Sequence, residues 1–474
     1  MEIQLTPTEP APAKTEVLLK EESPEKVLEV LAKPEADAKT DNSSNHTRSR
    51  TRNESLTPSQ LKQRAANVVV HSRLKPSALA HDALSALEPA VTGTHTVNGE
   101  VYNLHDDLPL NRRGYKYRAC RPNANFASNL YLTTDMPPFR VRACYFDRAS
   151  GVSCSEDASA VTTSLGWLLA RANVGMREGT HYFEFDVIHA NEGSGKAHVR
   201  LGIGRKEAAL EAPVGFDGYG YGLRDKTGQK ITLSRPHAFM EAGFGTGDTI
   251  GIVVKLPLLA DHRASNAAFA QSYQQSQPRK RKAAAMAVDS EERALSQPGN
   301  IVRDQIPIKY KSGLYFEQFE YTRTKQMDHL LNPVTVLGEK AVLEQEKDSK
   351  APLPVIPNSQ IVVYKNGELV GEMFNDLYSF LPLNISDDAQ ATESNTKQQQ
   401  NQSYRNTDDL SLGYYPMMSV FQNGVVGINA GPDFKYAVPE GATPLCEQYD
   451  NQVTEEWLWD IIDEVEAEYL DSFD

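Results

Sequence analysis

The strongest constraint on the fold of this chain is a series of short segments in which apolar and polar residues alternate. A period of two places every second side chain on one face of a β-strand, so each segment predicts a strand with one buried face. No helical pattern separates them. The segments are "HYFEFDVI" (181–188), "AHVRLGIG" (197–204), "DTIGIVVKL" (248–256), "SQIVVYKNGELVGEMF" (359–374) and "MMSVFQNGVVGINAG" (417–431).

Two of these segments contain an Asn-Gly pair, at Asn366 and at Asn423. Type I′ hairpin turns favour this pair because both residues accept a positive φ. Many short antiparallel strands without intervening helices predict an all-β protein, an antiparallel β-sandwich, which we place over residues 96–440.

Composition divides the rest of the chain. Residues 1–95 are rich in Pro, Glu, Lys, Ala, Ser and Thr and nearly free of aromatic residues, so burial cannot offset their ordering entropy and a disordered N-terminal tail is expected. Residues 259–300 and 386–409 are polar and low in complexity. We interpret both as insertions that loop out of one sandwich.

Several functional classes are disfavoured. The net charge of −14 argues against a surface that binds nucleic acid throughout. The four cysteines show no C-x-x-C spacing, and no apolar run approaches the roughly 18 residues of a membrane span. "NEGSGKAH" lacks the first glycine and the hydroxyl residue of a phosphate-binding loop, and no hydrolase or metalloprotease motif occurs. We expect no enzyme activity, no metal and no cofactor.

A family resemblance is carried by six stretches in fixed order. They are "GTHYFEFDVI", "VRLGIGR", "APVGFDGYGYGLRD", "GTGDTIGIVVKLP", "IVVYKNGELVGEMFNDL" and "YYPMMSVFQNGVVGINAGPDF". Together they resemble a SPRY domain, in the form found in the SPRY subunit of COMPASS-type histone lysine methyltransferase complexes, the Bre-two family of yeasts and Ash-two family of animals. The resemblance covers roughly residues 100–440 and a C-terminal helix, and it implies a SPRY-type sandwich.

The resemblance also implies a binding face for an acidic segment of the WD-repeat subunit of such a complex. Its positions in this chain are Trp167, Arg200, Pro213, Phe216 and Arg224. The chemistry is consistent, because guanidinium groups bind carboxylates through paired, charge-assisted hydrogen bonds. The alternative is structural: Arg200 would form a surface salt bridge while Trp167 and Phe216 belong to the core.

The C-terminus predicts an amphipathic helix over residues 453–472, with Thr454 as its N-cap. Nine carboxylates and no basic residue occupy the stretch from Thr454 to the end of the chain. The resemblance implies that this helix docks on a small dimeric Dpy-thirty-type subunit; the alternative is a helix folded back on the sandwich. The residues assigned to this contact are Trp457, Leu458, Ile461, Ile462 and Val465.

A basic tetrad lies in the first predicted insertion: Arg279, Lys280, Arg281 and Lys282. An import receptor could read it in an extended conformation, or it could contact DNA phosphates, or it could be a solvated charge run.

The resemblance as a whole implies a non-catalytic scaffold in the nucleus. It would bind the WD-repeat and Dpy-thirty-type subunits and so promote methylation of the lysine at the fourth position of histone H-three by a SET-domain methyltransferase subunit. It would contact nucleosomes indirectly or through basic loops, and no membrane. The alternatives are a SPRY substrate receptor of a ubiquitin ligase and an enzyme acting alone.

Overall fold

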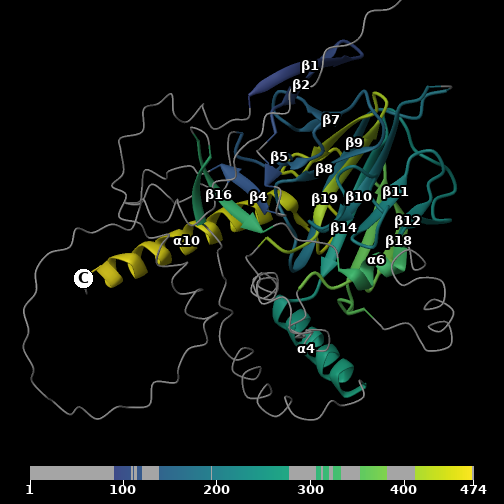
Figure 1. Ribbon diagram of the computed structural model, residues 1–474. Coiled ribbons are helices and arrows are strands. Elements are labelled where there is room, and N and C mark those ends of the chain that lie inside the picture. Colours follow the sequence, from purple (N-terminus) through teal and green to yellow (C-terminus); the bar gives the residue numbers. More distant parts are fainter. Residues whose placement is uncertain are drawn as a thin grey trace, which may run out of the picture. The chain divides into compact units, whose positions relative to one another are not determined.

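The computed structural model describes residues 90–107, 110–111, 115–119, 138–193, 195–276, 306–310, 313–319, 324–331, 353–381 and 411–471. Strands, nearly all of them antiparallel, are the main regular structure of these residues (Figure 1). The largest sheet, sheet A, has ten strands. Its order is β1 (Val91–Val97), β2 (Glu100–His105), β6 (Ser153–Cys154), β7 (Ala160–Thr162), β20 (Val425–Asn429), β9 (Gly179–His189), β14 (Thr249–Leu256), β17 (Gln360–Lys365) and β18 (Glu368–Asn375), with β21 (Thr443–Pro444) parallel to β9.

The second sheet, sheet C, has seven strands and carries the residues of the predicted binding face. Its order is β13 (Arg235–His237), β12 (Lys230–Thr232), β11 (Gly220–Arg224), β10 (His198–Gly204), β19 (Tyr415–Phe421), β8 (Leu168–Ala172) and β5 (Ala143–Arg148).

One apolar core joins the two sheets. Sheet A contributes Phe183 and Phe185 from β9, and sheet C contributes Leu201 and Ile203 from β10, all fully buried. Their spacing of two residues is the alternation seen in the sequence, because successive side chains of a strand point to opposite faces. The predicted antiparallel β-sandwich is therefore confirmed.

The two Asn-Gly pairs behave differently. Asn366 and Gly367 have φ angles of 52° and 82° and join the paired strands β17 and β18, as predicted. At the second pair the positive φ angles belong to Gln422 (42°) and Asn423 (71°). This turn joins β19 of sheet C to β20 of sheet A, so the predicted hairpin at Asn423 is wrong and the turn is a connection between the sheets.

The sandwich begins earlier than predicted. Strand β1 starts at Val91, inside the tail assigned to residues 1–95, and pairs with β2 along its length. Val97 and Tyr102 of this hairpin are buried against Ala160 and Val425, which explains why the strand is ordered. The tail before residue 90 lies outside the described residues.

The first insertion begins with a helix rather than a loop. Helix α4 (Leu259–Ser276) covers the start of residues 259–300. It is polar overall, but His262 and Asn266, four residues apart, are buried, and they bond to Ser379 Oγ (2.8 Å) and Leu381 O (3.3 Å). The sequence pattern missed this helix because its buried contacts are made by polar side chains. The insertion at 386–409 lies outside the described residues.

A third sheet and a short helix are also part of the described structure. A four-stranded sheet, sheet B, consists of β15 (Ile306–Tyr310), β16 (Gly313–Phe319), β4 (Tyr115–Ala119) and β3 (Leu110–Asn111), in that order. Helix α6 (Lys325–Leu331) contacts the outer face of sheet C through Met327.

The C-terminal helix α10 (Leu445–Asp471) is longer than predicted (Figure 1). It starts at Leu445 because Leu445 and Tyr449 are buried in the core. Thr454 lies inside the helix, where its hydroxyl donates to Asp450 O (2.8 Å), so its assignment as N-cap is wrong. No helix in the described part of the chain is long and apolar enough to span a membrane.

Candidate binding face

The outer face of sheet C carries a row of three residues on adjacent strands. Arg224 of β11 lies opposite Arg200 of β10, and Arg200 lies opposite Ser419 of β19. Residues directly paired across antiparallel strands point to the same face. Because the flanking Val199, Leu201 and other alternate residues fill the core, this row points away from it.

Among the residues that the structure describes, no carboxylate forms a salt bridge with Arg200 or Arg224, and Nε of Arg200 is buried without a hydrogen-bond partner. Burial, and then the positive charge of Arg224, lowers the pKa of Arg200 to about 10. Within the described part of the chain, the guanidinium of Arg224 donates to the neutral side chain of Gln229 (3.1 Å) and to no other group. The row therefore has unused donors and an excess of positive charge, which favours an anionic ligand.

Aromatic rings lie beside the arginine row. The guanidinium carbon of Arg200 lies 5.0 Å from the ring centroid of Trp167, within the range of a cation–π contact. The ring of Trp167 in turn contacts Phe421, with centroids 5.2 Å apart. Trp167 is not a core residue, because its side chain is half-buried at the outer face.

A loop that follows β10 lies over the same face. Within this loop Phe216 N donates to Pro213 O (3.0 Å), and Val214 N donates to Ser419 Oγ (2.8 Å), which joins the loop to the arginine row. Pro213 is half-buried, whereas 38% of Phe216 is exposed. An apolar ring in this position is available to a ligand.

The glycines of the stretch 198–225 let this loop approach the sheet. A Cβ at Gly222 would lie 2.7 Å from Val214 O, and one at Gly220 would lie 3.1 Å from Gly215 N. Gly215 itself has a φ of +79°, a conformation that L side chains rarely adopt. The glycines therefore serve close packing of the loop on β11.

The structure brings the five sequence-predicted residues to one face, although they do not form a single contact cluster. Trp167, Arg200 and Arg224 are joined directly, by the cation–π contact and the strand pairing. Pro213 and Phe216 are joined to them through the backbone of Val214 and the hydroxyl of Ser419.

Sequence reasoning missed Ser419 and Phe421 as members of this face. Both alternate with Met418 and Val420, which are buried in the core. The alternation in "MMSVF" therefore contained the signal that Ser419 and Phe421 share the outward face, beside Arg200.

The second predicted docking region, on α10, is partly described. Leu458, Ile462 and Val465 are half or more exposed, at 51%, 50% and 60%, and their spacing places them on one side of the helix. Ile461 is half-buried, and the side chain of Trp457 lies outside the described residues. The helix thus changes at about Val453 from core packing to an exposed apolar stripe.

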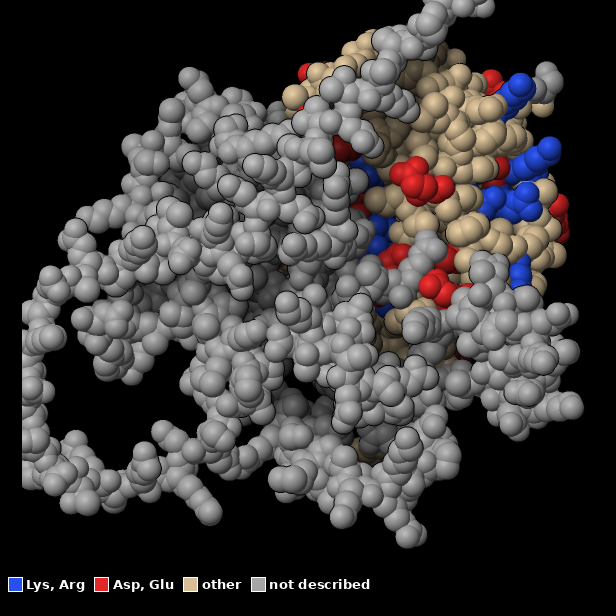
Figure 2. Space-filling model, viewed as in Figure 1, with Lys and Arg blue, Asp and Glu red and all other residues tan. Residues whose placement is uncertain are grey.

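Charge on the rest of the visible surface is mixed. Figure 2 shows Lys and Arg side chains close to Asp and Glu side chains on the described part of one face, so the acidic balance of the chain is not gathered there in one patch. The basic tetrad Arg279–Lys282 lies outside the described residues.

The two packed antiparallel sheets around one core define the class of this protein, an antiparallel β-sandwich with a basic and aromatic face on sheet C. Two of the solved structures found to be similar are human SPRY domains. One is that of human HERC1, with a TM-score of 0.27 and 11% identity over 59% of this chain and 92% of that structure. No family model matches the chain.

Sequence relatives define the family. The chain is 32% identical over 427 residues to the COMPASS component cclA of Colletotrichum higginsianum and covers 72% of that protein. It is 35% identical over 363 residues to the Set1 complex component ash2 of Schizosaccharomyces pombe, of which it spans 47%, about half. The COMPASS component BRE2 of Saccharomyces cerevisiae is 26% identical and covered to 93%. The chain belongs to the Ash2/Bre2/cclA family of COMPASS components.

Proposed function

We propose that this chain is a non-catalytic scaffold subunit of a COMPASS-type histone methyltransferase complex. The names of its relatives, components of COMPASS and Set1 complexes, support membership in such a complex. In this proposal a separate SET-domain subunit transfers the methyl group to the lysine at the fourth position of histone H-three, and the present chain acts in the nucleus by holding other subunits in place.

The observation that carries the proposal is the pair of opposed, unpaired guanidinium groups of Arg200 and Arg224 beside Trp167. An acidic peptide lying across β10 and β11 would give each guanidinium a carboxylate partner and relieve the repulsion between the two cations. Apolar side chains of the same peptide would cover Trp167 and Phe216. We assign this face to an acidic segment of the WD-repeat subunit.

The exposed stripe of α10 is assigned to a second partner, the small dimeric Dpy-thirty-type subunit. Leu458, Ile462 and Val465 present apolar surface along one side of a helix, the pattern that a hydrophobic groove accepts. The first two turns of the helix are anchored in the core through Leu445 and Tyr449. The proposed scaffold therefore has one rigid face and one projecting helix, each with its own partner. Contact of the tetrad Arg279–Lys282 with DNA phosphates or an import receptor stays a prediction.

Affinity purification of the tagged full chain from nuclear extract tests this function. We expect methyltransferase, WD-repeat and Dpy-thirty-type subunits to co-purify. Arg200→Glu with Arg224→Glu should lose the WD-repeat subunit and keep the small dimeric subunit, whereas Leu458→Glu with Ile462→Glu should do the reverse. Recovery of ubiquitin-ligase subunits in place of these partners would contradict the proposal.

A further inference from the structure

We propose that helix α6 is a positioning element that holds the loop between β10 and β11, and with it Pro213 and Phe216, in the geometry that accepts the acidic segment. This inference rests on the proposed function of that face. Three separate contacts of α6 carry it, one at each end of the helix and one at its centre, and all three lead to the same loop or to the turn beneath it.

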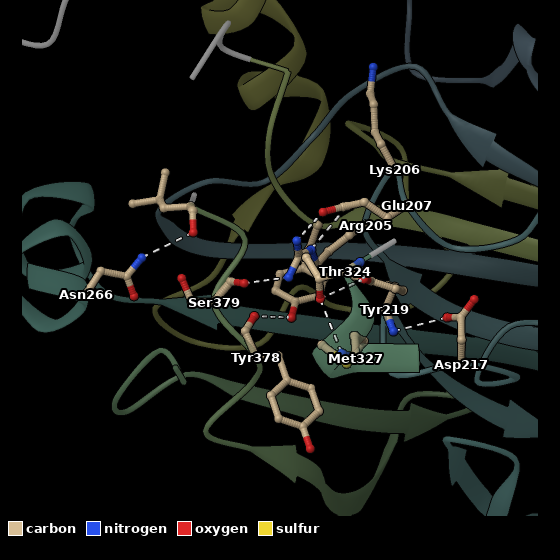
Figure 3. A network of polar contacts seen from close by, with 12 residues as sticks. Arg205, Lys206, Glu207, Asp217, Tyr219, Asn266, Thr324, Met327, Tyr378 and Ser379 are labelled. Atoms are coloured by element: carbon tan, nitrogen blue, oxygen red, sulfur yellow. Dashed lines mark hydrogen bonds and ion pairs between the residues drawn. The ribbon is translucent and has the colours of Figure 1, made fainter. Parts of the chain in front are cut away.

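The first contact lies at the start of α6 (Figure 3). Thr324 N donates to the phenol oxygen of Tyr219 (2.7 Å), and Thr324 Oγ1 accepts from Met327 N (3.3 Å) as a helix N-cap. Tyr219 is the last residue of the loop before β11. The residue that caps the helix is therefore also the residue that bonds to the loop.

The second contact is the side chain of Met327. It is buried in a small apolar cluster on the outer face of sheet C that includes Val214, Tyr219 and Met417. A Cβ at Gly218 would lie 2.4 Å from Met327 Sδ, so the absence of a side chain at Gly218 makes room for the methionine. Because Val214 lies between Pro213 and Gly215, loss of Met327 would leave a cavity under the part of the loop that presents Phe216.

The third contact lies at the end of α6. Arg235 Nη2 donates to Leu330 O (3.1 Å). The preceding residue of the same turn, Ser234, donates through Oγ to Phe216 O (2.7 Å) and through N to Gly215 O (2.9 Å). The turn between β12 and β13 therefore lies in a chain of hydrogen bonds from α6 to Phe216.

The root of the loop is also held by contacts outside α6. Arg205 pairs with Glu207 and lies with its guanidinium carbon 5.0 Å from the ring centroid of Tyr219. Arg205 Nη1 also donates to Ser379 O (2.5 Å) (Figure 3). Weakening α6 should therefore loosen the tip of the loop while leaving its root and the sandwich in place.

A loosened tip should weaken binding through lost preorganisation. If only a fraction of the molecules holds the loop in the binding geometry, the apparent dissociation constant rises by the inverse of that fraction. We expect Met327→Ala to weaken binding of the acidic segment about tenfold, the result of about one molecule in ten keeping the geometry. Met327→Leu, which refills the cavity, should restore most of the affinity.

The experiment uses the full chain and a synthetic peptide of the acidic segment of the cognate WD-repeat subunit, titrated by calorimetry. Met373→Ala is the matched control, because Met373 is equally a buried methionine but lies in β18 within the main core. Hydrogen exchange of residues 213–219 is measured in parallel. We expect both alanine variants to lower the melting temperature, and only Met327→Ala to weaken the peptide and speed exchange in the loop.

Two outcomes would overturn the inference while leaving the binding face intact. Met327→Ala could bind the peptide as tightly as the wild type, or Met373→Ala could weaken it to the same extent, which would mean that general destabilisation is responsible. Failure of the wild-type chain to bind the peptide would instead contradict the proposed function.

Discussion

Arg200 and Arg224 lie directly opposite each other on β10 and β11, with no carboxylate bound to either among the described residues. Like charges at directly opposed positions of an antiparallel pair are destabilising. Burial and the neighbouring Arg224 lower the pKa of Arg200 to about 10, and the carboxylate of Asp225 opposes this shift only in part. An anionic partner lying across the pair would reduce the repulsion between the two cations.

Removing the charge of Arg224 should therefore weaken binding of the acidic peptide without lowering the stability of the fold. We expect Arg224→Gln to leave the melting temperature unchanged or raise it by up to about 3 °C, since repulsion is relieved. The same change should weaken the acidic peptide about tenfold, through loss of a charge-assisted hydrogen bond. Lys226→Gln, an exposed cation just beyond β11, is the control and should affect neither measurement. A clear fall in melting temperature for Arg224→Gln would indicate that the arginine is structural.

Trp167 should behave as an apolar anchor and as an optical reporter. The chain has three tryptophans, and the other two, Trp457 and Trp459, lie in α10. Replacing both of these by Phe leaves Trp167 as the only tryptophan, so the acidic peptide should change the remaining fluorescence. Trp167→Ala should cost about 2 kcal/mol of binding free energy, as expected for a hot-spot aromatic residue. Fluorescence that does not respond to saturating peptide would place the peptide elsewhere.

The two parts of α10 should respond in opposite ways to substitution. Replacing Leu458, Ile462 and Val465 by Glu should abolish binding of the small dimeric subunit, because it places charges in an apolar groove, and should leave the melting temperature unchanged. Tyr449→Ala on the same helix should unfold or strongly destabilise the sandwich, by about 3 to 5 kcal/mol, since Tyr449 is buried in the core. Thermal denaturation followed by circular dichroism distinguishes the two. Collapse of the triple variant would show that the stripe belongs to the core.

Acid should destabilise the packing of α4. Burial, followed by the charges of three nearby arginines, lowers the pKa of His262 to about 3. Above pH of about 6.5 the imidazole is neutral in both folded and unfolded chains. Below it the unfolded chain takes up the proton first, so stability is lost between pH of about 6.5 and about 3, by up to about 1.4 kcal/mol per pH unit.

The variant His262→Gln isolates this contribution. Urea denaturation of both proteins between pH 7 and pH 5 should show a shallower pH dependence for the variant, since glutamine has no proton to bind and can still reach Ser379. Equal slopes would mean that His262 is not buried in its neutral form.

The fold followed from the sequence wherever a strand has one buried face. Phe183 and Phe185 alternate with polar residues because one side of β9 meets the apolar core, whereas Glu184 on the other side is buried through hydrogen bonds; this alternation is visible without a structure. Helix α4 was not visible, because His262 and Asn266 are buried through hydrogen bonds and leave no apolar period. The start of α10 was missed because Leu445 and Tyr449 pack on the sandwich, a tertiary contact that local capping rules do not contain.

The binding face was predictable as a set of residues but not as an arrangement. Resemblance supplied Trp167, Arg200 and Arg224, and the structure brings these three together. The hydrogen bond of Ser234 to Phe216 and the packing of Met327 with Val214 join segments that are 18 or more residues apart, and no pattern in the sequence predicts either contact.

Calorimetric titration of the acidic peptide into wild type and into the double variant Arg200→Glu, Arg224→Glu tests most directly whether these two arginines bind it. We expect the wild type to bind, with an affinity that falls as salt is added because partly exposed charges are screened over about 8 Å at physiological ionic strength. The double variant should show no measurable binding and an unchanged or higher melting temperature. Binding of the double variant with wild-type affinity would contradict the account.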